Sequence, residues 1–242
     1  MSDQVLKKEF LYEGKAKRLF TTNSENLLWV EFKDDLTAFN AEIKGSFKGK
    51  GEINLKISTF IFMYLESKGL TTHLKEALSE KDWVVEKTDI IPLEVVVRNK
   101  AAGSICKRLG LDNGQKFDPP MFEVFYKKDE LSDPLLTKEH VDFLNLCSNE
   151  DYEIVKSLAL KINELLRPLF LDANIDLVDF KVEFGKDSKG DIILADEISP
   201  DSCRLWDLDT GESMDKDRFR KDLGLVKENY EEILNRISEV FS

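Results

Sequence analysis

The stretch that decides the fold reads LVDFKVEFG over residues 177–185 and, after a charged turn, DIILADEISPDSCRLW over residues 191–206. Charged and apolar residues alternate in the first run, and this period of two is typical of a strand with two different faces. The turn GKDSKGD, residues 185–191, is rich in residues that favour hairpins. The sequence therefore predicts a hairpin that returns through Ile192–Ala195.

The charges of this hairpin gather on one face and at one end. Asp179, Lys181 and Glu183 share a face, and the return strand ends in two acids, of which Asp196 is the first. Pairing of the strands would bring Glu183 near Asp196, with Lys181 and Arg204 close by. Alternating charge on a strand more often marks a solvated face. Hard oxygen ligands beside serine and arginine nevertheless suit Mg²⁺ with phosphate, so we favour a functional site.

Composition limits the classes of partner. The chain has 242 residues, of which 42% are hydrophobic, so it can bury the core of one large domain or of two small lobes. Its 47 acids and 35 bases give a formal net charge of −12. Because nucleic-acid binding needs a basic surface, we expect no nucleic-acid partner. A local cationic pocket for a small anion is compatible with this charge.

The cysteines and the apolar runs indicate a location. Cys106, Cys147 and Cys203 are widely spaced and form no CxxC motif, which favours free thiols in a reducing compartment. The opening MSDQVLKKEF has no apolar signal core. No run approaches the roughly 18 apolar residues of a membrane span. We therefore expect a cytoplasmic protein without a membrane partner.

The remaining pattern predicts a mixed α+β fold. Strands are expected within residues 10–20 and at 27–32, 83–85, 93–97 and 122–126; helices are expected at 53–67, 101–109, 137–146, 151–171, 215–223 and 227–241. Three prolines make the rest of 112–134 a predicted loop. Strands dominate early and helices late, so we expect two fused lobes with a seam near 87–89 and a ligand cleft between them.

Two further motifs could bind anions. Gly14-Lys15-Ala16-Lys17 lies at a predicted hairpin tip, where glycine lets the backbone approach a phosphate. The motif is too short for a Walker A loop, and an ordinary charged turn is the alternative. Arg98 precedes Ala101-Ala102-Gly103-Ser104, small residues that would open a helix with free amides. A strand–helix junction with a buried ion pair from Arg98 is an equal alternative.

Taken together, the motifs closely resemble the phosphoribosylaminoimidazole-succinocarboxamide synthase (SAICAR synthetase) family. GKAK at 14–17, IIPLEVVVRNKAAGS at 90–104, LVDFKVEFG at 177–185 and DEISPDSCRLW at 196–206 occur in the family's order across nearly the whole chain. The family uses ATP to join L-aspartate to the carboxylate of carboxyaminoimidazole ribonucleotide in de novo purine biosynthesis. The implied fold is α+β with two fused lobes, an antiparallel-sheet lobe at 1–88 resembling the protein-kinase small lobe and a larger ATP-grasp-like lobe at 89–242.

The resemblance also implies cofactors, partners and a role for each matched residue. ATP and Mg²⁺ are the implied cofactors, the ribonucleotide and L-aspartate are the implied substrates, and a homodimer is the implied assembly. The matched residues are Gly14, Lys15, Ala16 and Lys17 on the ATP phosphates; Val85, Lys87 and Ile90 beside adenine; Glu183 and Asp196 on metal and nucleotide; Arg98, Ser104 and Arg204 on the ribonucleotide phosphate; Lys127 in a substrate-contacting middle loop; and Asp179, Lys181 and Asp201 as catalytic residues at the imidazole and reacting carboxylate.

Other readings and some details stay open at this point. A small-molecule kinase would lack an HRD-type loop and leave the second anion pocket unexplained, and a non-catalytic nucleotide-binding regulator would be expected to have lost a motif acid. The order of phosphorylation and amine attack, the general base and the aspartate pocket are not fixed by the sequence. Asn40 stands where some relatives carry Asp, which leaves its role open, and residues 41–51 are expected to form a mobile, partly substrate-contacting loop.

Overall fold

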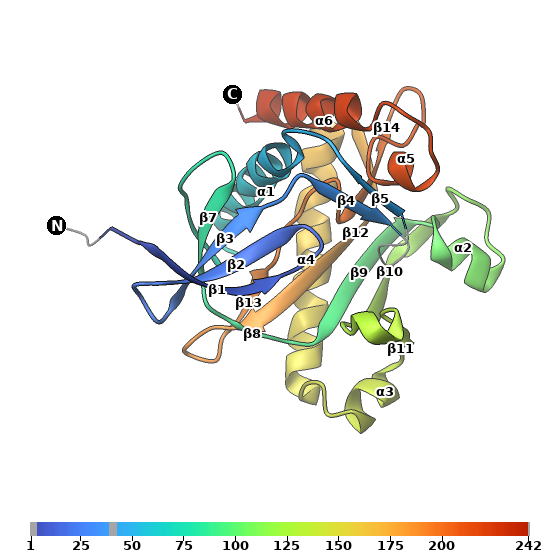
Figure 1. Cartoon of the computed structure of the whole chain (residues 1–242). Helices are drawn as coiled ribbons and strands as arrows, with labels where there is room; N and C mark the ends of the chain where they lie inside the picture. The colour runs from blue at the N-terminus through green and yellow to red at the C-terminus, as the bar shows by residue number, and fades with distance from the viewer. Residues whose placement is uncertain (1–3, 39–42, 242) are drawn as a thin grey trace.

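Two large antiparallel sheets, a two-stranded sheet and several helices build the fold of this computed structural model, which describes residues 4–38 and 43–241 (Figure 1). The first sheet has the strand order β1-β2-β3-β7-β6. Its strands are β1 (Lys7–Glu13), β2 (Lys17–Thr22), β3 (Leu27–Phe32), β7 (Asp82–Glu86) and β6 (Leu74–Ala77). The N–H of Gly14 donates to the carbonyl of Lys17 at 2.8 Å and closes the turn between β1 and β2, as the sequence predicted.

The second sheet is organised around its longest strand, β12. The order is β11-β10-β9-β12-β13, and β14 and β8 also pair with β12. Its strands are β8 (Asp89–Ile90), β9 (Leu93–Lys100), β10 (Lys116–Tyr126), β11 (Leu135–Leu136), β12 (Ile175–Lys186), β13 (Ile192–Ala195) and β14 (Cys203–Asp207). Glu183 lies opposite Ala195, so the predicted hairpin of β12 and β13 is confirmed.

The helices cover the sheets and join them. They are α1 (Lys50–Ser67), α2 (Ser104–Leu109), α3 (Lys138–Phe143), α4 (Asn149–Asp172), α5 (Asp217–Arg220) and α6 (Val226–Val240), with a 3₁₀ turn η1 (Asp129–Leu131). The long helix α4 packs on β12 and β9, and α1 packs on β3, β6 and α6 (Figure 1). Buried apolar residues of both sheets belong to one hydrophobic cluster. The mixed α+β prediction is confirmed.

The ends of α4 and α1 follow local chemistry. Ser148 caps α4 by accepting a hydrogen bond from the N–H of Asp151, and the side chain of Asp151 accepts from the N–H of Ser148. Helix α1 stops at Ser67, and Gly69 takes a φ of 85°, a left-handed conformation that ends a helix. The predicted end of this helix at residue 67 is confirmed.

Two segments differ from the sequence expectation. We expected Pro119 and Pro120 in a loop, but strand β10 runs through both. The strand tolerates them because its pairing with β9 is irregular between Lys116 and Met121, so no backbone N–H is needed there. The predicted helix at 215–223 shrinks to the four residues of α5. Just before α5, the carboxylate of Asp215 accepts the N–H of Leu205 at 2.7 Å and ties the chain to β14.

The sequence predicted a loop at 41–51, and this prediction is largely wrong for the described residues 43–51. Residues Ile43–Ser46 form β5, which pairs with β4 (Asp35–Ala38), and α1 already begins at Lys50. Gly45 of β5 lies against Phe219, since a Cβ atom there would stand 2.8 Å from the phenyl ring. Asn40 and residues 41–42 lie outside the described residues.

Candidate active site

Three alternate side chains of β12 form the floor of the site. Asp179, Lys181 and Glu183 point away from the hydrophobic cluster, to which Phe180 and Val182 belong. Asp179 and Glu183 are buried nevertheless, at 3% and 4% exposure. The predicted period of two is confirmed, but the charged face is not the solvated face that such a pattern usually marks.

At one end of this floor, two arginines share a single carboxylate oxygen. Arg98 of β9 and Arg204 of β14 lie in register with Asp179 on its two neighbouring strands. Their Nη1 atoms donate to Asp179 Oδ2 at 2.7 and 2.8 Å. The outer sides of the two guanidinium groups bond Glu123 at 2.7 Å and Asp217 at 3.0 Å. Adjacent strands therefore fix two guanidinium groups side by side, a geometry suited to phosphate.

The surrounding charges keep Arg204 and Asp217 ionised. Burial alone would lower the pKa of Arg204, but the carboxylates of Asp179 and Asp217 outweigh it and raise the pKa. The same cations act on Asp217, where burial would raise the pKa and the charges of Arg204 and Arg220 hold it below its usual value. Arg204 and Asp217 therefore both carry their charges at neutral pH.

A cavity of about 130 Å³ opens beside the arginines, and we call it the β12 cavity. Its lining residues are Val96, Arg98, Asp179, Lys181, Asp201, Ser202, Cys203, Arg204 and Arg220. Four of these side chains are cationic and two are acidic, so the cavity favours an anionic ligand. The predicted residues Arg98, Arg204, Asp179, Lys181 and Asp201 are thus brought together.

At the other end of the floor, lysines surround two carboxylates. Lys127 and Lys181 donate to Glu183 Oε1 at 2.8 and 2.9 Å, and Lys17 pairs with Asp196. Lys181 also lies 3.8 Å from Asp196 Oδ2 and therefore links the two acids. The predicted proximity of Glu183 and Asp196 is confirmed by this shared lysine.

The lysines set the protonation of this cluster. Burial would raise the pKa of Asp196, but Lys17 and Lys181 bring it below its usual value. Burial would lower the pKa of Lys181, yet the charges of Glu183, Glu94 and Asp196 raise it well above its usual value. Asp196 and Lys181 are therefore ionised at neutral pH, as a site for metal and phosphate requires.

Glu197 adds a carboxylate to which the sequence assigned no role. It is 4% exposed, and its Oε2 atom has no hydrogen-bond partner in the part of the chain that is described. Its Oε1 atom lies 3.7 Å from Lys17 Nζ. Burial raises its pKa, against the effect of Lys17. The Asp-Glu pair that ends β13 was visible in the sequence, but nothing local showed that the second acid is buried as well.

Whether the donors at this end fit a magnesium ion can be tested on their chemistry. Among residues 4–38 and 43–241, no group of three or more His, Cys, Asp or Glu side chains is arranged to hold a metal by itself. Mg²⁺ is commonly bound by one or two carboxylates together with substrate phosphates, however. Glu183, Asp196 and the unpartnered oxygen of Glu197 supply such hard oxygen donors. The residues fit an ion that phosphate oxygens help to bind.

Asp201 is held from two distant parts of the chain. Lys50, at the start of α1, lies 2.5 Å from Asp201 Oδ2 and is itself fully buried. Tyr230 of α6 donates its hydroxyl to Asp201 Oδ1 at 2.7 Å. Burial would raise the pKa of Asp201, but Lys50 brings it below its usual value. Sequence reasoning missed Lys50 and Tyr230, because neither lies in a motif and both approach Asp201 only through the tertiary fold.

The other residues predicted to bind the nucleotide lie in the β1–β2 turn and in the segment from β7 to β8. Lys15 pairs with Asp129 of η1 at 2.8 Å, across 114 residues of sequence. The carbonyl of Ala16 accepts the N–H of Lys33 at 2.8 Å. Val85 is buried in the core of β7, whereas Lys87 and Ile90 are exposed. Val85, Lys87 and Ile90 therefore follow one another from β7 to β8, and none of them joins the cluster around Glu183.

The predicted residue Ser104 begins α2 and is exposed. Gly103 just before it has a φ of 68°, and a Cβ atom there would stand 2.3 Å from Arg204 Nη2. The backbone at the start of α2 therefore lies directly against one of the paired arginines. Ser104 is the next residue after this contact, and its role at a phosphate site stays a prediction.

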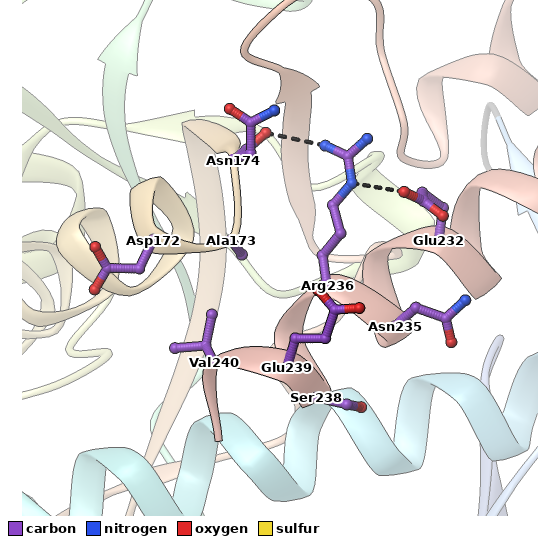
Figure 2. Close-up of a pocket in the computed structure, with 9 residues that line it drawn as sticks. All are labelled: Asp172, Ala173, Asn174, Glu232, Asn235, Arg236, Ser238, Glu239 and Val240. Carbon is purple, nitrogen blue, oxygen red and sulfur yellow. Dashed lines mark hydrogen bonds and ion pairs between the residues drawn. The ribbon is translucent and has the colours of Figure 1, made fainter. Parts of the chain in front are cut away.

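A larger cavity lies elsewhere and contains none of these residues. It has a volume of about 890 Å³ and lies between the end of α4 and helix α6 (Figure 2). Arg236 crosses it, donating to the carbonyl of Asn174 at 3.1 Å and to Glu232 at 2.7 Å. None of the predicted site residues lines this cavity, so size alone does not locate the chemistry.

Fold and site together define a class: a mixed α+β protein in which one strand joins an arginine pair to a lysine–carboxylate cluster. The family model for SAICAR synthetase matches residues 10–237. A phosphoribosylaminoimidazole-succinocarboxamide synthase from Thermoanaerobacter sp. (strain X514) is 53% identical over 231 residues, covering 96% of this chain and 98% of the relative. The chain therefore belongs to the SAICAR synthetase family.

Solved structures agree with this assignment. The crystal structure of phosphoribosylaminoimidazole-succinocarboxamide synthase from Ehrlichia chaffeensis matches with a TM-score of 0.93 at 45% identity, covering 95% of this chain and 98% of that one. A SAICAR synthetase (Type-2) in complex with ADP matches with a TM-score of 0.92 at 47% identity, covering 96% of this chain and 98% of that one.

No helix among the described residues is long and apolar enough to cross a membrane.

Proposed function

We propose that this protein is the ATP-dependent ligase that joins L-aspartate to the carboxylate of carboxyaminoimidazole ribonucleotide, giving SAICAR, ADP and phosphate in purine biosynthesis. One observation carries the proposal. Strand β12 joins the arginine pair at Asp179 to the lysine–carboxylate cluster at Glu183, and Lys181 lies between them. A reaction that uses two phosphate-bearing substrates needs two such anion sites on one continuous surface.

The arginine end suits the ribonucleotide. Its phosphate would bind Arg98 and Arg204, with Ser104 at the edge, because paired guanidinium groups match phosphate oxygens in geometry and charge. Asp179 would then orient the two arginines in addition to bordering the ligand. The imidazole and its carboxylate would extend into the β12 cavity toward Lys181 and Asp201.

The opposite end suits ATP. The relative solved with ADP supports a nucleotide substrate. The turn of Gly14 to Lys17 would lie over the phosphates, and Lys17, Lys127 and Lys181 would turn from Glu183 and Asp196 to the phosphate oxygens. Val85, Lys87 and Ile90 would border adenine where the chain crosses between the sheets.

We include Mg²⁺ in the proposal, held by Glu183 and Asp196. Bound there with the phosphates, the ion would offset the negative charge that develops during phosphoryl transfer. Lys17 and Lys181 support such a role, since their charges bring the pKa of Asp196 below its usual value.

The chemistry accounts for the kinds of residue present. A carboxylate cannot release oxide at neutral pH, so one of its oxygens must leave as phosphate when the amine of aspartate forms the amide bond. The γ-phosphoryl group of ATP supplies that phosphate, and the amine gives up its proton. Cations that stabilise transferred phosphate matter more here than a covalent nucleophile. Asp201 and Asp179 lie in the cavity as acceptors for the amine proton.

Three further parts of the proposal concern organisation. Residues 1–88 would form the nucleotide lobe, resembling the protein-kinase small lobe, and residues 89–242 the ATP-grasp-like lobe, with the cleft at the β12 floor. Two copies would form a homodimer, which light scattering can test. A cytoplasmic location is supported by Cys106, Cys147 and Cys203, which are all free thiols.

The decisive experiment is ADP release with each substrate omitted in turn. The ligase should release ADP at full rate only when ATP, the ribonucleotide and L-aspartate are all present, and SAICAR should form in equal amount. ADP release that is independent of both other substrates would overturn the ligase. Phosphorylation of a small molecule without any amine would instead identify a kinase, and nucleotide binding without turnover a regulator.

A further inference from the structure

Two cations, Lys216 just before α5 and Arg220 at its end, lie near the β12 cavity. They are four residues apart, a spacing that places two side chains on the same face of a helical turn. Arg220 lines the cavity directly. The N–H of Lys216 donates to the carbonyl of Pro200 at 3.2 Å, so Lys216 lies against the loop that carries Asp201. Neither cation was assigned a role from the sequence.

Lys216 forms no ion pair with the residues that the structure describes. Among the described residues, no carboxylate oxygen lies within 4.0 Å of its ammonium, although the side chain is half-buried. Burial lowers its pKa; the charge of Asp201 opposes this shift, and Arg220 and Lys50 add to it. Arg220 uses one nitrogen on Asp217 at 2.5 Å. An ammonium partly withdrawn from water without a counter-ion favours binding of an external anion.

We propose that Lys216 and Arg220 bind a carboxylate of L-aspartate, and this inference rests on the proposed ligase function. Asp201 lies beside them and is held in place by Lys50 and Tyr230. Its negative charge matches the amino group of the same ligand. An amino acid that carries a carboxylate at Lys216 and an amine at Asp201 presents that amine to the part of the cavity where Lys181 lies.

Kinetics of three variants test this assignment. Lys216→Met should raise KM for L-aspartate about tenfold or more, the loss typical of a charge-assisted hydrogen bond, while KM for ATP and for the ribonucleotide stays within about twofold. Lys216→Arg should recover most of the loss. The matched control is Lys221→Met, which removes the same charge one residue beyond α5 and should leave all three constants unchanged. An unchanged KM for aspartate in Lys216→Met, or a rise confined to the ribonucleotide, overturns the assignment.

A second measurement needs neither turnover nor a variant. With ADP and the ribonucleotide present, Lys216 of the wild-type chain is acetylated with acetic anhydride and quantified by mass spectrometry, with Lys221 as the internal reference. L-aspartate and succinate should protect Lys216, and ethanolamine, which has no carboxylate, should not. Equal labelling with and without L-aspartate overturns the inference. If the wild-type chain also fails to release ADP with all substrates present, the ligase proposal fails separately.

Discussion

The backbone of Gly103 lies against the guanidinium of Arg204, so closely that a Cβ atom at residue 103 would stand 2.3 Å from Nη2. The start of α2 therefore determines how Arg204 reaches Asp179, although Gly103 and Arg204 are far apart in sequence. We expect Gly103→Ala to displace Arg204 and to raise KM for the ribonucleotide by at least about tenfold, because one charge-assisted contact to phosphate is lost. Steady-state kinetics with the ribonucleotide varied measures this effect.

Gly110 supplies the matched control for this prediction. It also has a positive φ, 65°, at the other end of α2, but a Cβ atom there would meet no atom of the described residues within 4 Å. Gly110→Ala should cost roughly 1 kcal/mol of stability and leave KM unchanged. Equal effects of the two variants on KM would show that backbone strain, not contact with Arg204, is responsible.

Glu183→Gln tests the proposed metal end. The variant keeps the shape of the side chain but removes the charge between Lys127 and Lys181. We expect kcat to fall about a hundredfold or more and the Mg²⁺ concentration for half-maximal rate to rise, because a neutral amide is a poor ligand for a hard cation. Asp176→Asn on the same strand, where Asp176 pairs with Lys100, is the control and should retain activity. Normal turnover by Glu183→Gln with an unchanged melting curve would remove Glu183 from the metal site.

Tyr230→Phe tests whether the last helix supports catalysis. Removing the hydroxyl deletes one hydrogen bond to Asp201, and we expect the free energy of unfolding to fall by about 1.5 to 3 kcal/mol. The rate should fall about fivefold or more, since Asp201 is then held by Lys50 alone. Tyr64→Phe, which removes a longer 3.4 Å bond to a carbonyl of α4, should change the rate little. A full rate in Tyr230→Phe would limit this residue to a structural role.

Asp215 gives stability a defined pH dependence. Burial, with the charge of Asp217 beside it, raises the pKa of Asp215 to about 6 in the folded chain, against 3.8 for an ordinary aspartate. The folded state therefore binds the proton more tightly than the unfolded state. The resulting stabilisation is complete below pH 3.8 and is lost as the pH rises through about 6.

The pH effect can be isolated by comparing the wild-type chain with Asp215→Asn in urea at several pH values. Relative to the variant, the wild-type chain should lose roughly 2 to 3 kcal/mol of stability between about pH 4 and 7. The asparagine also loses an acceptor, for example to the N–H of Leu205, so the two curves need not meet at any pH. A constant difference across this range would contradict the raised pKa.

The sequence predicted the features that depend on residues close together in the chain. It missed the contacts that depend on the register between strands. Alternation along β12 was enough to place Asp179, Lys181 and Glu183 on one face, because a strand has a period of two. The sharing of Asp179 by Arg98 and Arg204 depends on how β9 and β14 align with β12, and no local pattern encodes that alignment. The motif match linked these residues as a set without giving their contacts.

The residues around Asp201 show the same limit more strongly. Lys50 reaches it from the start of α1, far upstream in the chain, and Tyr230 reaches it from the last helix. Each looks ordinary in its own segment, a lysine near a helix start and an aromatic residue on an amphipathic helix. The prolines of β10 misled in the opposite direction, since a locally irregular pairing with β9 accommodates residues that usually interrupt strands.

Strand β12 also fixes the distance between the two ends of the site. Asp179 and Glu183 are four residues apart on one strand, which sets their separation at about 13 Å from the rise of a strand. A strand cannot stretch, so the span between the two anion sites is fixed by counting residues. Deleting one residue between them would turn one of the two acids into the hydrophobic core. In the proposed function, this fixed distance sets how far apart the two phosphate-bearing substrates bind.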